Sequence, residues 1–251
     1  MRLCILRTRL YKYKTFNCEK VDSLDRARDI FHKNELYFSS PSDFNDPFDC
    51  LVHLDFKRIK KDEFWRYYDN VLARKTNLTQ QERKESFETA YASKEIENIF
   101  VHSLQNSFNS RGVYSLSSKN DDILMWSHYS DGHRGYCFEL DELKIEAQKV
   151  KYKKRFPKFN LFGNDMLLKI LLFTKPLPWK YEREWRYFSK ESGPIKINNN
   201  SIKSVIFGSQ MDEKNRKSLL EIVERGNHHP NIFEAIINSD TYSVSIEKYK
   251  I

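Results

Sequence analysis

Hydrophobic and polar residues change their spacing several times along this chain of 251 residues. Residues 9–13 alternate polar and apolar side chains, which is typical of a β-strand with one buried face. The strand pattern returns in seven later segments: 35–40, 112–118, 135–140, 179–189, 202–208, 232–238 and 242–249. The chain therefore carries enough strands for a sheet of substantial size.

Helical spacing occurs between these strands. Leu24, Ala27 and Ile30 share one helical face, and Asp22 or Ser23 precedes them as an N-cap. Further helices are expected at 123–129, behind two aspartates, at 212–226, and in the apolar run 166–173. Because strands and helices do not alternate regularly, we expect an α+β fold with mixed or antiparallel sheets and flanking helices.

Residues 57–106 differ from the rest of the chain, because they read as long, charge-rich helices. Thr79 and Glu82 have the spacing of a capping box at the start of one of them. We therefore expect a single domain over residues 1–251, with a helical insertion at about 57–108.

No segment has the length or the apolar character of a membrane helix. The run 166–173 contains a lysine and is far shorter than the roughly 20 residues that span a bilayer. Arginines at positions 2, 7 and 9 interrupt the N-terminal segment, which disfavours a secretory signal. These features predict a cytoplasmic protein that does not contact a membrane.

Composition adds an expectation about partners. The chain has 43 Lys and Arg against 35 Asp and Glu, which gives a net charge of +8 and favours anionic partners such as nucleotides or nucleic acid. The hydrophobic fraction of 39% is sufficient for a packed core and excludes general disorder. Four cysteines without a C-x-x-C pair indicate reduced thiols.

Two strands carry polar side chains with the spacing of one face. Ser115 and Ser117 are two residues apart and point the same way, toward a ligand or toward solvent. By the same rule Glu182, Glu184 and Arg186 share a face of the segment 179–189. This row is either a salt-bridge ladder or an acid pair suited to a cationic transition state, such as an oxocarbenium ion.

Two further segments combine aromatic and basic groups. In residues 124–135 we expect Trp126 to pack in the core and His128 and His133 to bond a neighbouring loop, since their spacing is poor for zinc. Residues 151–156 mix cations with aromatics, as nucleic-acid contacts often do, although a solvated charge run gives the same pattern. The phosphate-binding, dinucleotide-binding and serine-hydrolase glycine motifs are absent.

Four segments in order resemble one large bacterial family, the domain of unknown function numbered twenty-nine seventy-one. They are residues 10–13, 36–48, 124–135 and 181–186. That family is in turn similar to the ADP-ribosyltransferase superfamily, with a first strand bearing His or Arg, a later Ser-x-Ser strand and a Glu-bearing strand. This chain has Lys12 at the first position, then Ser115 and Ser117, then Glu182 and Glu184.

The resemblance implies an ADP-ribosyltransferase-like fold and roles for these residues. Glu184 would bond the nicotinamide ribose and stabilise the developing cation, and Glu182 would orient the acceptor group. The cofactor-binding residues would be those that meet the substrate NAD: Lys12, Ser115 and Ser117 at the nucleotide, Tyr13 or Trp126 stacked on nicotinamide, and Asn45 and Asp46 in the wall of the site. We expect Lys12, both serines and Glu184 to line one pocket.

The resemblance thus implies an NAD-dependent ADP-ribosyltransferase that modifies nucleic acid or protein, in a toxin or an antiviral defence role. RNA or DNA would be the acceptor on the basic surface, and an antitoxin or regulatory protein would be a partner. Two other classes stay open: a non-catalytic module that binds nucleic acid or a nucleotide, and a metal-dependent nuclease with converging carboxylates. No metal is expected in the transferase.

Overall fold

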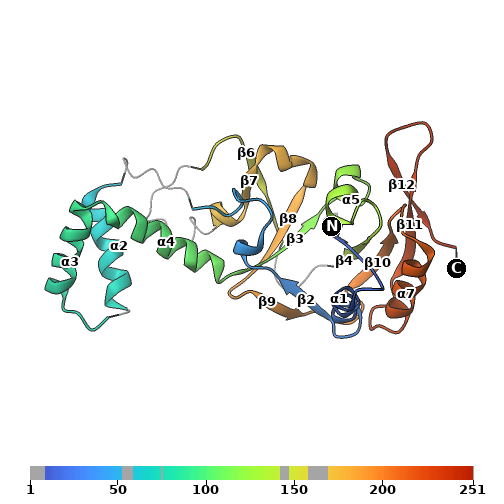
Figure 1. Cartoon of the computed structure of the whole chain (residues 1–251), viewed down its shortest axis with the longest axis horizontal. Helices are drawn as coiled ribbons and strands as arrows, with labels where there is room; N and C mark the ends of the chain where they lie inside the picture. The colour runs from blue at the N-terminus through green and yellow to red at the C-terminus, as the bar shows by residue number, and fades with distance from the viewer. Residues whose placement is uncertain (1–8, 53–58, 75, 142–146, 158–168, 251) are drawn as a thin grey trace, which may run out of the picture. The chain divides into compact units, whose positions relative to one another are not determined.

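The computed structural model describes residues 9–52, 59–74, 76–141, 147–157 and 169–250. The chain divides into two compact units (Figure 1). The first unit consists of Met1–Ser39, Gly112–Val150 and Pro178–Ile251, and the second of Ser40–Arg111 and Lys151–Leu177. The predicted helical insertion, 57–108, falls in the second unit, which also includes the loop before it and a later segment.

An eight-stranded sheet forms the first unit, in the order β12-β11-β10-β4-β1-β3-β8-β5. Its neighbours pair antiparallel except β10 and β11, which pair in parallel. The strands are β1 (Leu10–Lys14), β3 (Gly112–Ser117), β4 (Tyr136–Leu140), β5 (Gln148–Lys149), β8 (Glu184–Ser189), β10 (Ile202–Phe207), β11 (Asn231–Ile237) and β12 (Val244–Lys248). A separate antiparallel pair joins β2 (Glu35–Phe38) to β9 (Gly193–Lys196).

Helices cover both faces of the large sheet. Against one face pack α1 (Val21–Phe31) and α7 (Glu213–Glu224), whose buried residues join Phe138 and Phe207 in one hydrophobic cluster. Against the other face packs α5 (Ile123–Tyr129), whose Trp126 joins a smaller cluster with Tyr11 and Tyr13. The sheet therefore separates two cores, and the phase of each strand decides which core a side chain enters.

The second unit is mostly helical, as its charge-rich sequence predicts. It contains the short 3-10 helix η1 (Pro41–Asp43), then α2 (Lys61–Ala73), α3 (Gln80–Ala92) and α4 (Glu95–Asn109), and a parallel pair β6 (Lys151–Lys153) and β7 (Thr174–Pro176). The expected capping box is present, because Thr79 and Glu82 bond each other's backbone amides at the start of α3. Aromatic rings at positions 64, 87 and 100 pack between the helices.

The predicted α+β class is confirmed, and most predicted elements occur within a few residues of their expected bounds. The segment 179–189 differs, because a 3-10 helix, η3 (Leu177–Glu182), replaces the first half of the expected strand. The apolar run 166–173 lies partly outside the described residues, and its residues 169–172 are helical. Within the described ranges, no helix is both long enough and apolar enough to cross a membrane.

Candidate functional site

Ser117 and Glu184 lie directly opposite each other on the neighbouring strands β3 and β8. The same register places Ser115 opposite Arg186. Opposed residues of an antiparallel pair project from the same face of the sheet. The structure therefore brings both predicted serines and the predicted catalytic glutamate onto one face, together with an arginine.

Lys12 lies on the other face. Across β1 and β3, Tyr11 is opposite Ser117, so the next residue, Lys12, points the opposite way. Its ammonium group donates a hydrogen bond of 2.7 Å to the backbone oxygen of Ser115 and lies 4.7 Å from the ring centre of Tyr114. The expectation that Lys12 shares a pocket with the serines and Glu184 is not met, because the sheet separates its side chain from theirs.

Glu184 and Arg186 form a buried, two-pronged ion pair. The Nε atom of Arg186 is 2.6 Å from Oε1 of Glu184, and its Nη2 atom is 3.1 Å from Oε2. Only 3% of Glu184 and 1% of Arg186 are exposed. The two residues can meet because they are two apart on one strand, and each compensates a charge that would be expensive to bury alone.

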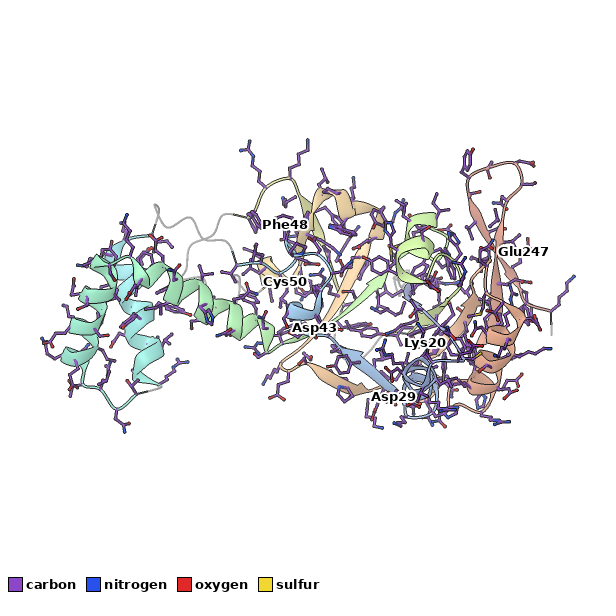
Figure 2. The ribbon with its side chains drawn as sticks, in the orientation of Figure 1. Lys20, Asp29, Asp43, Phe48, Cys50 and Glu247 are labelled. Atoms are coloured by element: carbon purple, nitrogen blue, oxygen red, sulfur yellow. The ribbon has the colours of Figure 1, made fainter. Side chains whose placement is uncertain are left out.

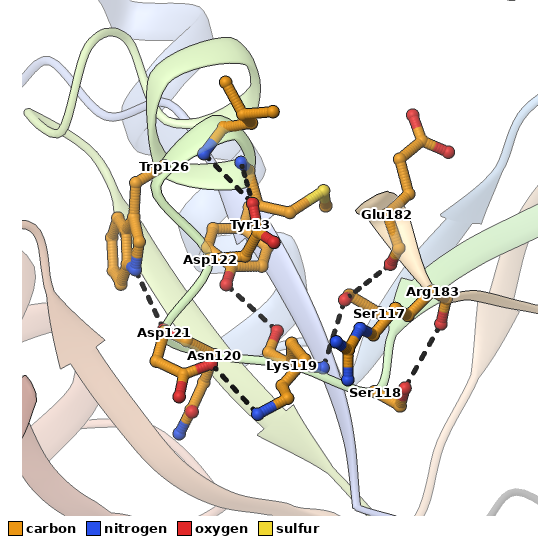
Figure 3. A network of polar contacts seen from close by, with 12 residues as sticks. Tyr13, Ser117, Ser118, Lys119, Asn120, Asp121, Asp122, Trp126, Glu182 and Arg183 are labelled. Atoms are coloured by element: carbon orange, nitrogen blue, oxygen red, sulfur yellow. Dashed lines mark hydrogen bonds and ion pairs between the residues drawn. The ribbon is translucent and has the colours of Figure 1, made fainter. Parts of the chain in front are cut away.

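Glu182 reaches the same region by a different route from the one its spacing predicts. It ends η3 rather than lying on the strand, and Arg183, with a left-handed φ of 46°, separates it from β8. The prediction that Glu182 shares a strand face with Glu184 is therefore wrong. Ser117 nevertheless ties it to β3, since its hydroxyl donates a 2.7 Å bond to the Glu182 backbone oxygen (Figure 3).

Tyr129, at the end of α5, contacts the carboxylate of Glu182. Its hydroxyl donates a 2.5 Å hydrogen bond to Oε1 of Glu182, whose side chain is buried. Burial, then the Glu182 carboxylate, raises the pKa of Tyr129 far above its ordinary value, with a smaller contribution from Glu184. One residue earlier in the helix, the exposed His128 bonds the hydroxyl of Tyr181 through Nδ1 at 2.8 Å.

Sequence analysis did not identify Tyr129 or Tyr181 as part of this site. Both lie in segments that resemble the bacterial family, but nothing in their local spacing shows that the end of α5 faces η3. That juxtaposition results from α5 packing on the sheet. The role of Arg186 as the partner of Glu184, by contrast, follows from the strand period.

Tyr13 and Trp126, the residues expected to stack on nicotinamide, hold the loop after β3. The Tyr13 hydroxyl donates to the backbone oxygen of Lys119 at 2.9 Å, and Nε1 of Trp126 donates to that of Asn120 at 2.8 Å (Figure 3). Their rings meet edge to face at 5.0 Å, and both residues are buried. Protein contacts therefore occupy both rings, and a nicotinamide could reach them only after repacking.

Asn45 and Asp46, expected in the wall of the site, belong to the second unit. Asp46 is buried, and its Oδ1 atom accepts a 3.0 Å hydrogen bond from the Phe48 amide. This bond between residues two apart is typical of an Asx turn. Asp46 therefore shapes its own loop, and its role toward NAD stays a prediction.

A cavity of about 580 Å³ in the first unit lies at the end of β1, beside the start of α1. None of the predicted catalytic or cofactor-binding residues lines it. Its lining includes Lys14, Lys20 and Arg26. Burial, with the nearby positive charge of Arg26, lowers the pKa of Lys14 to about 8.

Comparison of the chain with models of protein families, with curated proteins and with solved structures finds no match. The fold defines a mixed α+β protein with a mostly antiparallel sheet, and its chemistry has to be argued from its own residues. In the part of the chain that the structure describes, no group of three or more His, Cys, Asp or Glu side chains could hold a metal ion. The three cysteines in that part, Cys18, Cys50 and Cys137, are free thiols.

Proposed function

We propose that this protein is an NAD-dependent ADP-ribosyltransferase with Glu184 as its catalytic carboxylate. One observation supports the proposal above others: Ser115, Ser117 and Glu184 share one face of adjacent strands, with Ser117 directly opposite Glu184. The resemblance described above requires the Ser-x-Ser strand and the glutamate to face each other. A glutamate on the opposite face from the serines would have contradicted it.

In this proposal the bond between C1′ of the nicotinamide ribose and the ring nitrogen breaks, and its electron pair leaves with nicotinamide. Positive charge develops on the ribose, and the Glu184 carboxylate opposes it while accepting a hydrogen bond from a ribose hydroxyl. Arg186 holds that carboxylate in place through both of its oxygens. The acceptor then bonds C1′ and loses its proton to water, and Glu182 with Tyr129 orients the acceptor.

The burial of Glu184 imposes a requirement on this mechanism. With 3% of the residue exposed, NAD can meet the carboxylate only if the groups that cover it move on binding. The bond between Ser117 and Glu182 would hold the rest of the site in place during that movement. Nucleic acid or protein serves as the acceptor, and the role would be that of a toxin or a defence effector.

The same burial favours a second function, a non-catalytic module that binds nucleotides or nucleic acid. In such a module the buried Glu184–Arg186 pair would serve only to hold the sheet together. The positive net charge would attract the ligand. The described residues offer no observation that favours the metal-dependent nuclease. The transferase and the module differ in whether a charge at position 184 is needed for bond breaking.

The test is release of nicotinamide from labelled NAD, with total cell RNA, DNA and protein supplied as acceptors. The single variant Glu184→Gln removes the carboxylate charge that the buried Arg186 contacts with two nitrogens, so the double variant Glu184→Gln/Arg186→Gln, which removes both charges, accompanies it. Loss of a transition-state contact of this kind lowers kcat about a hundredfold or more. The matched control is Glu234→Gln, which breaks the Arg216–Glu234 pair elsewhere on the sheet.

Full activity of a folded double variant would show that Glu184 is not catalytic and would favour the binding module. Absence of nicotinamide release from the wild-type protein with every acceptor would contradict the transferase itself. Glu182→Gln separates the two glutamates, because it should abolish transfer to the acceptor while some hydrolysis of NAD by water continues.

A further inference from the structure

A cavity of about 200 Å³ lies wholly within the second unit, apart from the residues discussed above. Its inner wall includes Cys50, Leu171 and Lys175, which are buried. Lys175 forms a 3.5 Å ion pair with the buried carboxylate of Asp49. The charges at the inner wall are thus matched, and the cavity is otherwise mostly apolar.

The mouth of the cavity carries large apolar side chains in contact with solvent. Phe48, Leu51 and Phe156 line it and are 57%, 37% and 38% exposed. The rings of Phe48 and Phe156 have centres 6.4 Å apart and planes tilted by 50°. They are splayed rather than stacked, and both side chains are partly exposed, so a third flat group from solvent can contact them.

Phe48 and Cys50 belong to the segment that follows η1, and Figure 2 labels both residues. Gln105 of α4 accepts a hydrogen bond from the Val52 amide at 3.1 Å and donates one to the Cys50 backbone oxygen at 3.5 Å. Phe156 follows β6, which pairs with β7. Two separate parts of the unit therefore present the two rings at one mouth.

Beside these rings lies a run of three exposed cations, Lys153, Lys154 and Arg155. Within the residues that the structure describes, none of the three forms an ion pair, and no carboxylate lines the cavity. Lys153 ends β6, so the run begins where the strand stops. A ligand here would meet apolar ring faces and positive charge together.

The size of the cavity narrows the choice of ligand. Sites for drug-sized molecules usually measure about 300–1,000 Å³, so a cavity of about 200 Å³ fits a single flat ring and not a whole dinucleotide. We propose that it receives one base of a single-stranded nucleic acid, stacked on Phe156 and Phe48, while the three cations hold the adjoining phosphates. Aromatic platforms beside a basic track are the usual means of binding single strands.

This inference goes beyond the proposed function, because it rests on the second unit and needs no NAD chemistry. It is tested without NAD, by fluorescence anisotropy of the full chain with a labelled oligothymidylate, so its failure is distinguishable from absence of nicotinamide release. We expect log affinity to fall with log salt with a slope of about −2, since three phosphate contacts each contribute about −0.7 for a single strand.

Two variants separate stacking from charge. Phe156→Leu keeps an apolar side chain but loses the ring, and should weaken binding at least about fivefold without changing the salt slope. Lys153→Gln/Lys154→Gln/Arg155→Gln should weaken binding and bring the slope close to zero. The matched control is Lys84→Gln/Lys217→Gln/Lys248→Gln, which removes the same charge from other exposed positions and should bind like the wild type.

Three outcomes would overturn the proposal. One is equal binding by the wild type and by folded Phe156→Leu, with folding checked by circular dichroism. Another is a mononucleotide that binds as tightly as the strand, which would identify a free nucleotide as the ligand. The third is binding to vesicles of anionic lipid without binding to the oligothymidylate, which would assign the rings and cations to a membrane surface.

Discussion

Arg186 holds both carboxylate oxygens of Glu184, with N–O distances of 2.6 and 3.1 Å, and the pair is almost fully removed from solvent. A surface pair of this kind would contribute little to stability. In a buried position, each charge depends on the other, because an unpaired ion inside a protein costs several kcal/mol. The pair therefore links the stability of β8 to the residue proposed for catalysis.

The first prediction follows from that dependence. Glu184→Gln should lower the free energy of unfolding by about 3 kcal/mol or more, since it removes the negative charge that two nitrogens of the buried Arg186 guanidinium contact. The double variant Glu184→Gln/Arg186→Gln should recover most of the loss. Urea unfolding monitored by circular dichroism measures both, with Glu234→Gln as the control. A single variant as stable as the wild type would contradict the buried pair.

Tyr129 provides the second prediction. Tyr129→Phe removes the hydroxyl that donates to the Glu182 carboxylate, and a hydrogen bond to a charged group contributes about 1.5–3 kcal/mol. We expect a loss of stability of that order, together with reduced transfer to the acceptor. The control is Tyr181→Phe, whose partner His128 is exposed, and which should cost much less. Equal losses in the two variants would argue against a special role for the Tyr129–Glu182 bond.

The third prediction concerns pH. Burial and Arg26 lower the pKa of Lys14 to about 8, below its ordinary value of 10.5, so between these values the unfolded chain binds more protons than the folded one. The unfavourable contribution of Lys14 is complete below about pH 8 and disappears as the pH rises toward 10.5. Lys14→Met should therefore stabilise the protein at pH 7, by about 1–2 kcal/mol because the side chain is only partly buried.

The measurement for Lys14 is urea unfolding from pH 7 to pH 9.5, where the difference between variant and wild type should shrink as the pH rises. Work above pH 10 is avoided, because burial raises the pKa of Tyr13 and Tyr114, and their stabilisation is lost once the unfolded tyrosines ionise. Lys20→Met, at an exposed position beside the same cavity, is the control. A constant difference across this range would contradict a pKa near 8.

The fourth prediction concerns the glycine before β4. A Cβ atom at Gly135 would lie 2.0 Å from the backbone oxygen of Lys14, which is a clash between two strands rather than with a flexible side chain. Gly135→Ala should therefore destabilise the protein by about 3 kcal/mol. Gly132→Asn is the control, since its left-handed φ of 58° suits asparagine. Thermal unfolding compares them, and a small effect of Gly135→Ala would show that the strands can separate at this point.

The sequence alone determined the fold class, most elements and one part of the site. Period-two alternation identified β3 and β8, and the same period correctly placed Ser115 with Ser117 and Glu184 with Arg186. Helix signals, such as the capping box at Thr79, were equally local. These features can be predicted from the sequence because each depends on residues within a few positions of each other.

Tertiary structure decided the rest. Lys12 points to the opposite face from Ser117, because Tyr11 is the β1 residue that pairs with Ser117. Such a register joins segments that are distant in the sequence, so local spacing does not determine it. Glu182 leaves the strand because the chain turns at Arg183 with a positive φ, for which the residue type carries no signal. The meeting of Tyr129 with Glu182, and that of Phe48 with Phe156, likewise join positions far apart in the chain, so only long-range packing could specify them.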